Sequence, residues 1–409
     1  MSEIVLVSVS GPDRPGITAS LTEVMGRFGV NVLDIGQAVI HHNLSWGMLV
    51  EVPPEAVNSP VFKELMFKAH ELGLLMQLTP ISNEDYNEWV GQQGQARYVI
   101  TVLSKALKAE ALSQVSELIA VNGLNIDQIR RMSGRELLSV SRHKRRSAIE
   151  FHVRGPAPDH ALLHATFLQL SQRLDIDIAI QEDNVFRRNR RLVCFDMDST
   201  LIQNEVIDEL AMVAGVGDEV AEITERAMRG EIGFKESFKE RLALLKGLPE
   251  SKLQQVAEAL TITDGAQTLI NTLKHHKFKI AILSGGFTYF ARYLQEKLGV
   301  DYIHANELEI VDGALTGNVV GEIVDETRKA DLLRQIAAQE DIHLEQVIAV
   351  GDGANDVPML CIAGLGIAFR AKPIVKQRTR FALGSSSLDS ILFLIGMRER
   401  DFRLIETIA

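Results

Sequence analysis

The sequence contains only two cysteines, Cys194 and Cys361, and neither belongs to a Cys-x-x-Cys or Cys/His spacing typical of a metal site. Both lie in apolar surroundings, so we expect two reduced residues in the core. No apolar run approaches the roughly 20 residues that cross a bilayer. The start, Met-Ser-Glu-Ile, lacks the basic head and apolar body of a signal peptide. We therefore expect a cytoplasmic protein without membrane contact.

Basic residues are also comparatively few, since 43 Lys and Arg stand against 54 Asp and Glu and give a formal charge of −11. This charge argues against nucleic acid as a partner, because such binding needs a cationic face. The basic run Arg187–Arg191 is short, and we interpret it as a solvated linker before the second half of the chain. His143–Arg146 is interpreted as a loop. A length of 409 residues predicts two to three domains.

The first 182 residues contain an internal duplication with a period of about 94 residues. Each copy shows the order strand, helix, strand, strand, helix, strand, judged from apolar spacing and glycine breaks. The first copy comprises 4–10, 17–28, 32–40, 47–52, 61–72 and 74–80, and the second comprises 98–103, 109–121, 126–129, 148–153, 160–174 and 176–181. This βαββαβ pattern predicts two ferredoxin-like domains.

The duplication, with its Gly11-Pro-Asp-Arg-Pro-Gly16 loop, resembles the ACT family of small domains that bind amino acids. The resemblance implies an amino-acid effector, with L-serine the simplest candidate, and a homodimer. It places the ligand near Gly11, Asp13, Gly16, Asn31 and Asn125, although the second copy lacks the glycine and proline motif. The alternative is that both copies are packing modules that enlarge an oligomer interface.

From residue 192 onward, short apolar strands alternate with helices. The expected strands are 192–195, 279–283, 302–305, 346–350 and 365–368. This alternation predicts a Rossmann-like parallel sheet with helices on both faces, which binds ligands at the carboxyl ends of its strands. Asp196, Ser284 and Asp352 each follow such a strand, so we expect them to meet in one crevice.

Residue chemistry in this crevice fits removal of a phosphoryl group. Asp196 can attack phosphorus, and Asp198 can protonate the leaving oxygen and then activate water. Oxygen ligands favour Mg2+, which we assign to Asp196, Asp352 and a main-chain carbonyl near Asp198. Lys329 can neutralise phosphate charge.

The phosphate oxygens also need hydrogen-bond donors. Ser284 and the amides of Gly285 and Gly286 are suitable because they follow a predicted strand. Asn355 lies in the final motif, Gly351-Asp-Gly-Ala-Asn-Asp356. Each motif alone could be an ordinary turn, but four of them in this order are improbable by chance.

These motifs resemble the haloacid dehalogenase superfamily and, within it, the phosphoserine phosphatase family. The resemblance implies Asp196 as nucleophile, Asp198 as acid and base, Ser284 and Lys329 as phosphate ligands, and Asp352 as a metal ligand. We therefore expect an ACT-like domain at 1–90, a second at 91–184, and a hydrolase domain at 185–409 with a helical cap at about 205–262.

Substrate choice is expected in that cap. By the same resemblance, Glu205 pairs with the ammonium of O-phospho-L-serine, Arg241 pairs with its carboxylate, and Met228 and Phe234 supply apolar contacts. The alternative is that Glu205 and Arg241 lie on solvated helix faces. Two further functions stay open at this point, namely a phosphatase for another small phosphomonoester or a phosphoprotein, and an amino-acid-sensing binding protein.

Overall fold

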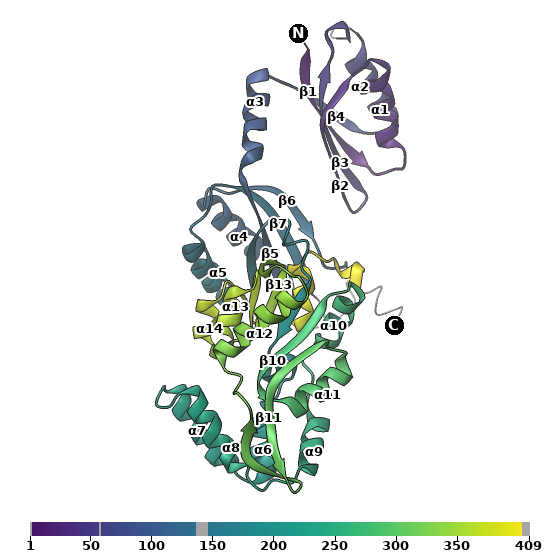
Figure 1. The fold of residues 1–409 in the computed structure, drawn as a ribbon. Coiled ribbons are helices and arrows are strands. Elements are labelled where there is room, and N and C mark those ends of the chain that lie inside the picture. Colours follow the sequence, from purple (N-terminus) through teal and green to yellow (C-terminus); the bar gives the residue numbers. More distant parts are fainter. Residues whose placement is uncertain (1, 57–58, 136–145, 403–409) are drawn as a thin grey trace. The chain divides into compact units, whose positions relative to one another are not determined.

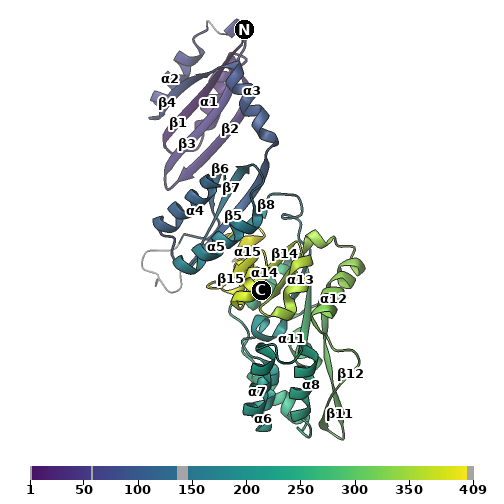
Figure 2. The ribbon, with the colours of Figure 1, turned by 90° about the vertical axis from the view of Figure 1, so that its left-hand side faces the viewer.

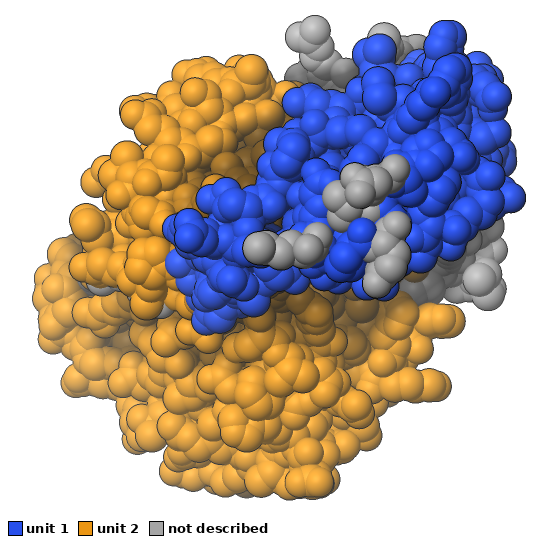
Figure 3. Space-filling view, turned by 90° about the horizontal axis from the view of Figure 1, so that it is seen from above, with its two compact units in different colours: residues 1–95 blue, residues 96–409 orange. Residues whose placement is uncertain are grey.

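The computed structural model describes residues 2–56, 59–135 and 146–402. The chain divides into two compact units, residues 1–95 and 96–409, which Figure 3 draws in different colours. Within the described ranges, no helix is long and apolar enough to cross a membrane. Each unit is described by itself below.

The first unit is a four-stranded antiparallel sheet in the order β2-β3-β1-β4 (Figure 1). Its elements are β1 (Glu3–Pro12), α1 (Ile17–Arg27), β2 (Asn31–Ile40), β3 (Asn43–Val52), α2 (Val61–Glu71), β4 (Leu75–Ile81) and α3 (Asn83–Gly91). The helices α1 and α2 bury one face of the sheet, with Val7, Leu21 and Leu65 in the shared core. The predicted βαββαβ order is confirmed, and α3 is an additional helix that the sequence analysis did not predict.

The second unit opens with a sheet of the same kind, in the order β6-β7-β5-β8. Its elements are β5 (Ala96–Ser104), α4 (Ala109–Val121), β6 (Asn125–Arg131), β7 (Ser147–Gly155), α5 (His160–Leu174) and β8 (Asp177–Glu182). The two helices cover one face, and Leu103, Ala148 and Ala179 on the other face join the core of the C-terminal domain. Figure 2 shows β15 (Phe381–Leu383) and α15 (Ile391–Leu394) of that domain beside this sheet.

The C-terminal domain is built on a seven-stranded sheet in the order β12-β11-β10-β9-β13-β14-β15. The strands are β9 (Leu192–Phe195), β10 (Lys279–Phe287), β11 (Tyr302–Val311), β12 (Ala314–Val320), β13 (Val347–Gly351), β14 (Leu365–Phe369) and β15 (Phe381–Leu383). Every pair is parallel except β11 with β12. The parallel core is confirmed, and the edge strands β12 and β15 were not predicted.

Alternate residues of the central strands serve opposite faces of this sheet, as strand geometry requires. Val193 and Phe195 pack beneath α10 (Ala266–His275), α11 (Thr288–Leu298) and α15 (Ile391–Leu394). Leu192 and Cys194 pack beneath α12 (Glu326–Gln339), α13 (Val357–Ile362) and α14 (Pro373–Arg378). Helices on both faces leave only the strand ends free for chemistry.

The segment between β9 and β10 forms a helical cap, as expected. Its helices are α6 (Val206–Ala214), α7 (Gly217–Met228), α8 (Phe234–Leu244) and α9 (Ser251–Ala259). Phe234 is the first residue of α8, and the preceding Gly233 adopts extended backbone angles at the helix start. The strand β12 packs against α8.

Two predictions about single segments are wrong. Cys361 is exposed on α13, whereas Cys194 is buried as expected. Arg187 and Arg190 of the supposed solvated linker are buried, with 4% and 8% of their surface exposed. Residues 143–145 lie outside the described ranges, and Arg146 forms an ion pair with Asp389.

Candidate active site

The strand β9 delivers the first two aspartates of the site. All four of its residues are fully buried, which fixes the strand and places Asp196 directly at its carboxyl end. The Asp196 carboxylate accepts a hydrogen bond from the amide of Met197 at 2.7 Å. Ser199 then adopts a left-handed backbone with φ 53°. This turn directs the chain away from the sheet and into the cap.

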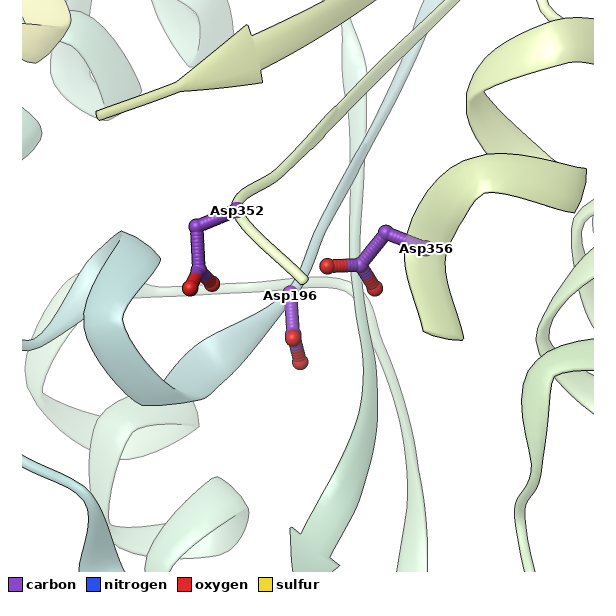
Figure 4. A group of neighbouring side chains, drawn as sticks. All are labelled: Asp196, Asp352 and Asp356. Atoms are coloured by element: carbon purple, nitrogen blue, oxygen red, sulfur yellow. The ribbon is translucent and has the colours of Figure 1, made fainter. Parts of the chain in front are cut away.

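Three carboxylates converge above the strand ends (Figure 4). Oxygen atoms of Asp196, Asp352 and Asp356 lie within 4.8 Å of one another. Asp196 and Asp352 are the carboxylates that the sequence analysis assigned to the metal, and Asp356 is an addition to that set. Near Asp198 the sequence analysis assigned a main-chain carbonyl to the metal, and the Asp198 carboxylate is not one of these three.

A buried lysine lies among these acids. Lys329 Nζ is 2.9 Å from Asp196 Oδ1 and 2.7 Å from Asp356 Oδ1. Burial disfavours its charge, but the two carboxylates outweigh burial and raise the pKa of Lys329. Lys329 is therefore a fixed positive charge beside the nucleophile candidate.

The single positive charge of Lys329 does not balance the negative charge of the three carboxylates. Burial, followed by the charge of Asp196, raises the pKa of Asp352 to about 8 and that of Asp356 to about 7. The hydroxyl of Thr200 donates to Asp352 Oδ1 at 3.2 Å. Hard oxygen donors that repel one another this strongly are suited to hold a small divalent cation.

Asp198 differs from the other acids in its contacts. Its Oδ1 accepts a hydrogen bond from the amide of Val206 at 3.0 Å. Burial, then the charges of Glu205 and Asp196, raises the pKa of Asp198 well above its usual range. A carboxyl group with a raised pKa keeps its proton to higher pH, which suits it to act as a general acid.

The loop after β10 supplies the phosphate-binding candidates. Ser284 is fully buried, and its hydroxyl accepts a hydrogen bond from the Gly286 amide at 2.9 Å. The amide of Gly286 is thus already paired, and both Gly285 and Gly286 line the cleft. A Cβ on Gly286 would lie 2.5 Å from Asp198 Oδ2, so only glycine fits beside the acid.

Asn306 on β11 holds this loop in place. Its Nδ2 donates to the carbonyl oxygens of Gly285 at 2.8 Å and Gly286 at 3.2 Å. Its Oδ1 accepts from the amide of Val324 at 2.8 Å, just before α12 and its Lys329. Asn306 is only 2% exposed. One buried amide thus ties the serine loop to the segment that leads to the lysine.

A cleft of about 590 Å3 lies between these strand ends and the cap. The predicted catalytic residues Asp196, Asp198 and Asp352 and the predicted substrate-binding residues of the cap line the same cleft. The other predicted residues that line it are Glu205, Phe234, Arg241, Gly285 and Asn355. Ser284 and Lys329 lie buried at its base. The side chain of Met228, the last residue of α7, is outside the described part of the chain.

Glu205 and Arg241 present opposite charges to the cleft. Glu205 Oε1 accepts a hydrogen bond from the Ser199 hydroxyl at 2.7 Å. Desolvation inside the cleft raises the pKa of Glu205, and the Ser199 hydrogen bond opposes this rise. Arg241 Nε donates to the Ser237 carbonyl at 3.4 Å, and no described carboxylate forms an ion pair with Arg241. Its guanidinium can therefore accept a carboxylate partner.

The predicted effector residues occupy turns and strand starts of the two ACT-like sheets. Gly11 lies in β1, and Gly16 caps α1 with φ 91°. Asp13 is exposed. Asn31 donates to Glu51 at 3.2 Å in the first copy, and Asn125 donates to Asp127 at 3.1 Å in the second.

The sequence analysis missed three residues that shape the cleft. The sequence analysis gave no role to Ser199 and Thr200, whose hydroxyls donate to Glu205 and Asp352. Asn306 carried no signal, because its partners lie about 20 residues away on either side.

Family comparisons agree with this architecture. Residues 3–79 and 96–181 each match an ACT domain family, and residues 193–360 match the haloacid dehalogenase-like hydrolases. A phosphoserine phosphatase of Streptomyces coelicolor is 41% identical over 99% of this chain and 95% of its own length. A phosphoserine phosphatase of Mycobacterium tuberculosis is 39% identical over 96% and 93%.

Solved structures give the same result. A haloacid dehalogenase family hydrolase from Salmonella enterica serovar Typhi superposes with a TM-score of 0.62 at 30% identity, covering 73% of this chain and 99% of its own. A probable phosphoserine phosphatase from Vibrio cholerae superposes with a TM-score of 0.58 at 34% identity, covering 78% and 90%. Both likenesses extend beyond the hydrolase domain alone.

Proposed function

Because the chain belongs to the phosphoserine phosphatase family, we propose that it hydrolyses O-phospho-L-serine to L-serine and phosphate, as a step in making L-serine. The observation that carries the proposal is the cleft in which Glu205 and Arg241 face Asp196. A carboxylate suits the ammonium of phosphoserine and a planar guanidinium suits its carboxylate. The phosphate is then directed towards the strand ends.

The reaction proceeds in two displacements at phosphorus. An Asp196 oxygen attacks, the bond from phosphorus to the serine oxygen breaks, and Asp198 gives its proton to that oxygen. Water then attacks the phosphorus of the aspartyl-phosphate, Asp198 takes the water's proton, and Asp196 is released as a carboxylate. The raised pKa of Asp198 supports its role as the initial acid.

The charge of the phosphoryl group is balanced by groups that are already fixed. Lys329 stands 2.9 Å from Asp196 and can pair with a phosphate oxygen. Ser284, the amide of Gly285 and Asn355 are the proposed hydrogen-bonding partners. Asp196, Asp352, Asp356 and a carbonyl near Asp198 would hold Mg2+, which supplies charge neutralisation when bound.

The cap has two proposed tasks. Phe234 and Met228 would contact the aliphatic part of the substrate and exclude water from the cleft. Ser199 positions Glu205, because their 2.7 Å hydrogen bond fixes the carboxylate at the cleft wall. Both tasks distinguish phosphoserine from phosphomonoesters without an amino-acid backbone.

The ACT domains suggest regulation. We propose that an amino acid, with L-serine as the first candidate, binds near Gly11, Asp13, Gly16, Asn31 or Asn125 and alters the activity of a cytoplasmic homodimer. The two ACT family matches support an amino-acid effector. A response to none of the common amino acids would contradict this part of the proposal alone.

The test is phosphate release from O-phospho-L-serine, O-phosphothreonine and p-nitrophenyl phosphate, with Mg2+ and after chelation. We expect preference for phosphoserine, no turnover after chelation, and none for Asp196→Asn. Preference for the aryl phosphate would contradict the substrate and keep the chemistry. Absence of all turnover would favour an amino-acid-sensing protein.

A further inference from the structure

The basic linker Arg187–Arg191 has no role in the chemistry above. It joins the second ACT domain to β9 and therefore lies at the amino ends of the central strands. Asp196 stands at the opposite end of β9, four residues and about 13 Å further along the strand. Any ligand at the linker would thus occupy a site separate from the catalytic cleft.

A cavity of about 350 Å3 opens along this linker. Five cationic side chains line it, and no carboxylate of the described residues does. The lining residues are Arg187, Arg188, Asn189, Arg190, Arg191, His276, Lys277, Phe278, Ile395 and Met397. Such a concentration of positive charge is notable in a chain with a net charge of −11. Its potential favours an anion.

Two of the arginines already have carboxylate partners from the second ACT domain. Arg187 forms a buried ion pair with Glu150 on β7. Arg188 donates through one nitrogen to both oxygens of Asp183, at 2.7 and 2.9 Å. These pairs anchor the linker to the ACT domain, so they explain two of the five charges.

The other three charges have no carboxylate ion pair among the described residues. Arg190 donates to the main-chain carbonyls of Glu345 and, at 3.2 Å, Gly364. Arg191 Nε donates to the amide oxygen of a linker asparagine at 3.2 Å. Lys277 is exposed at the turn after α10, where its backbone has φ 63°. A non-glycine residue in this conformation is uncommon.

The buried arginines are also incompletely satisfied. Within the described part of the chain, Nε of Arg187 and Nε of Arg190 are buried without a hydrogen-bond partner. Burial and, more weakly, the neighbouring Arg187 charge lower the pKa of Arg190 to about 10, although Glu345 opposes the shift. Burying charge without full compensation is unfavourable. An oxyanion in the cavity would offset the repulsion between the charges of Arg187 and Arg190.

We propose that this cavity binds a small phosphate-bearing anion, which Lys277 and Arg191 contact at the mouth and Arg190 attracts from the wall. Guanidinium and ammonium groups around one concave site are the usual partners of phosphate oxygens. The phosphate is either free or part of a small organic molecule. Since Arg187 links the cavity wall to Glu150, the anion would bind where the ACT domain joins the catalytic domain.

The test uses pyrophosphate as the probe, in equilibrium dialysis at low salt with a chelator present. The variant combines Lys277→Ala with Arg191→Gln, both at exposed positions. Its control, Lys63→Ala with Arg334→Gln, removes the same charge elsewhere. We expect the control to bind like wild type and the variant to bind at least about tenfold more weakly, as loss of charged hydrogen bonds predicts.

Several outcomes would overturn the site. The first is a double variant that binds pyrophosphate as tightly as wild type, and the second is no binding by wild type. The third is binding that Ser284→Ala abolishes, because this result would place the probe in the catalytic cleft. Displacement by inorganic phosphate but not glycerol 3-phosphate indicates a free ion, and the reverse indicates an organic phosphate. A single-stranded oligonucleotide that displaces pyrophosphate better than either would refute a small ligand. Lys277→Ala alone serves if the double variant melts early.

Discussion

Replacing Asn306 tests whether one buried amide organises the phosphate loop. In Asn306→Ala, the carbonyls of Gly285 and Gly286 and the amide of Val324 lose their partners. Each such loss in a buried site costs about 1 kcal/mol at the low end of the usual range. The expected decrease in the free energy of unfolding is therefore about 3 kcal/mol.

Activity should decrease as well, for a distinct reason. If Asn306 no longer holds the loop, the groups at Ser284 and Gly285 cannot be aimed at the phosphate, and loss of such aimed donors lowers kcat by about a hundredfold. Inhibition by product phosphate should weaken in parallel. In Asn306→Asp, the activity relative to wild type should rise as the pH falls, because a protonated carboxyl can again donate one hydrogen bond.

The assays are urea unfolding and phosphoserine turnover, with Asn318→Ala as the matched control. Asn318 lies on the neighbouring strand β12 and is exposed, and its side-chain amide donates to the side chains of Glu309 and Thr316. If Asn306→Ala unfolds and turns over like Asn318→Ala, the positioning role is refuted. A stability loss without a change in kcat or phosphate inhibition would leave Asn306 with a purely structural role.

Two further predictions concern charged groups. Arg241→Ala should lower kcat/KM for phosphoserine by at least about a hundredfold through loss of a charge-assisted carboxylate pair, with a much smaller change for p-nitrophenyl phosphate. Glu150→Gln should lower the free energy of unfolding at neutral pH by about 3 kcal/mol, because buried Arg187 loses its partner. Burial alone would raise the pKa of Glu150, but hydrogen bonds and charge from His152 and Arg187 outweigh burial and lower it. The ionised Glu150 therefore stabilises the folded protein above about pH 4.3, and this contribution to the free energy of unfolding is lost as the pH falls.

The controls for these two predictions are Arg226→Ala and Glu225→Gln. Arg226 belongs to the cap and pairs with Glu240 near the surface, so its loss should affect both substrates equally. Glu225 is an exposed acid, 3.5 Å from Arg229, and should contribute little. Equal losses on both substrates for Arg241→Ala, or a pH-independent difference for Glu150→Gln, would contradict the respective reasoning.

Local sequence patterns were sufficient for most of the fold. Strand β9 and helix α5 have the predicted limits, because their apolar spacing continues to the last residue. The edge strands β12 and β15 were missed because β15 has only three residues and β12 contains Gly317 and Asn318, which strands disfavour. Arg187 and Arg190 were misplaced for a different reason. Their burial depends on Glu150 and on the carbonyls of Glu345 and Gly364, all far away in sequence.

The candidate site shows the same division. Asp196 and Asp352 follow recognisable strands, so the topology alone predicts that they meet. The role of Asp356 depends on a lysine 27 positions earlier that also reaches Asp196. No local pattern encodes such a shared partner, and the sequence analysis therefore assigned no role to Asp356.

One face of the second ACT sheet is covered only by the C-terminal domain, and this has a consequence for synthesis of the chain. Gln181 on β8 donates to the carbonyl of Leu394, and the amide of Gly134 bonds to Glu399. At a translation rate of about 5 to 20 residues per second, the ribosome needs roughly 10 to 40 s after β8 to reach Leu394. The first ACT domain can complete its core during this time. The second ACT domain must wait for the C-terminal domain with Leu103, Ala148 and Ala179 exposed to solvent. This interval is therefore the stage of synthesis at which misassembly is most favoured.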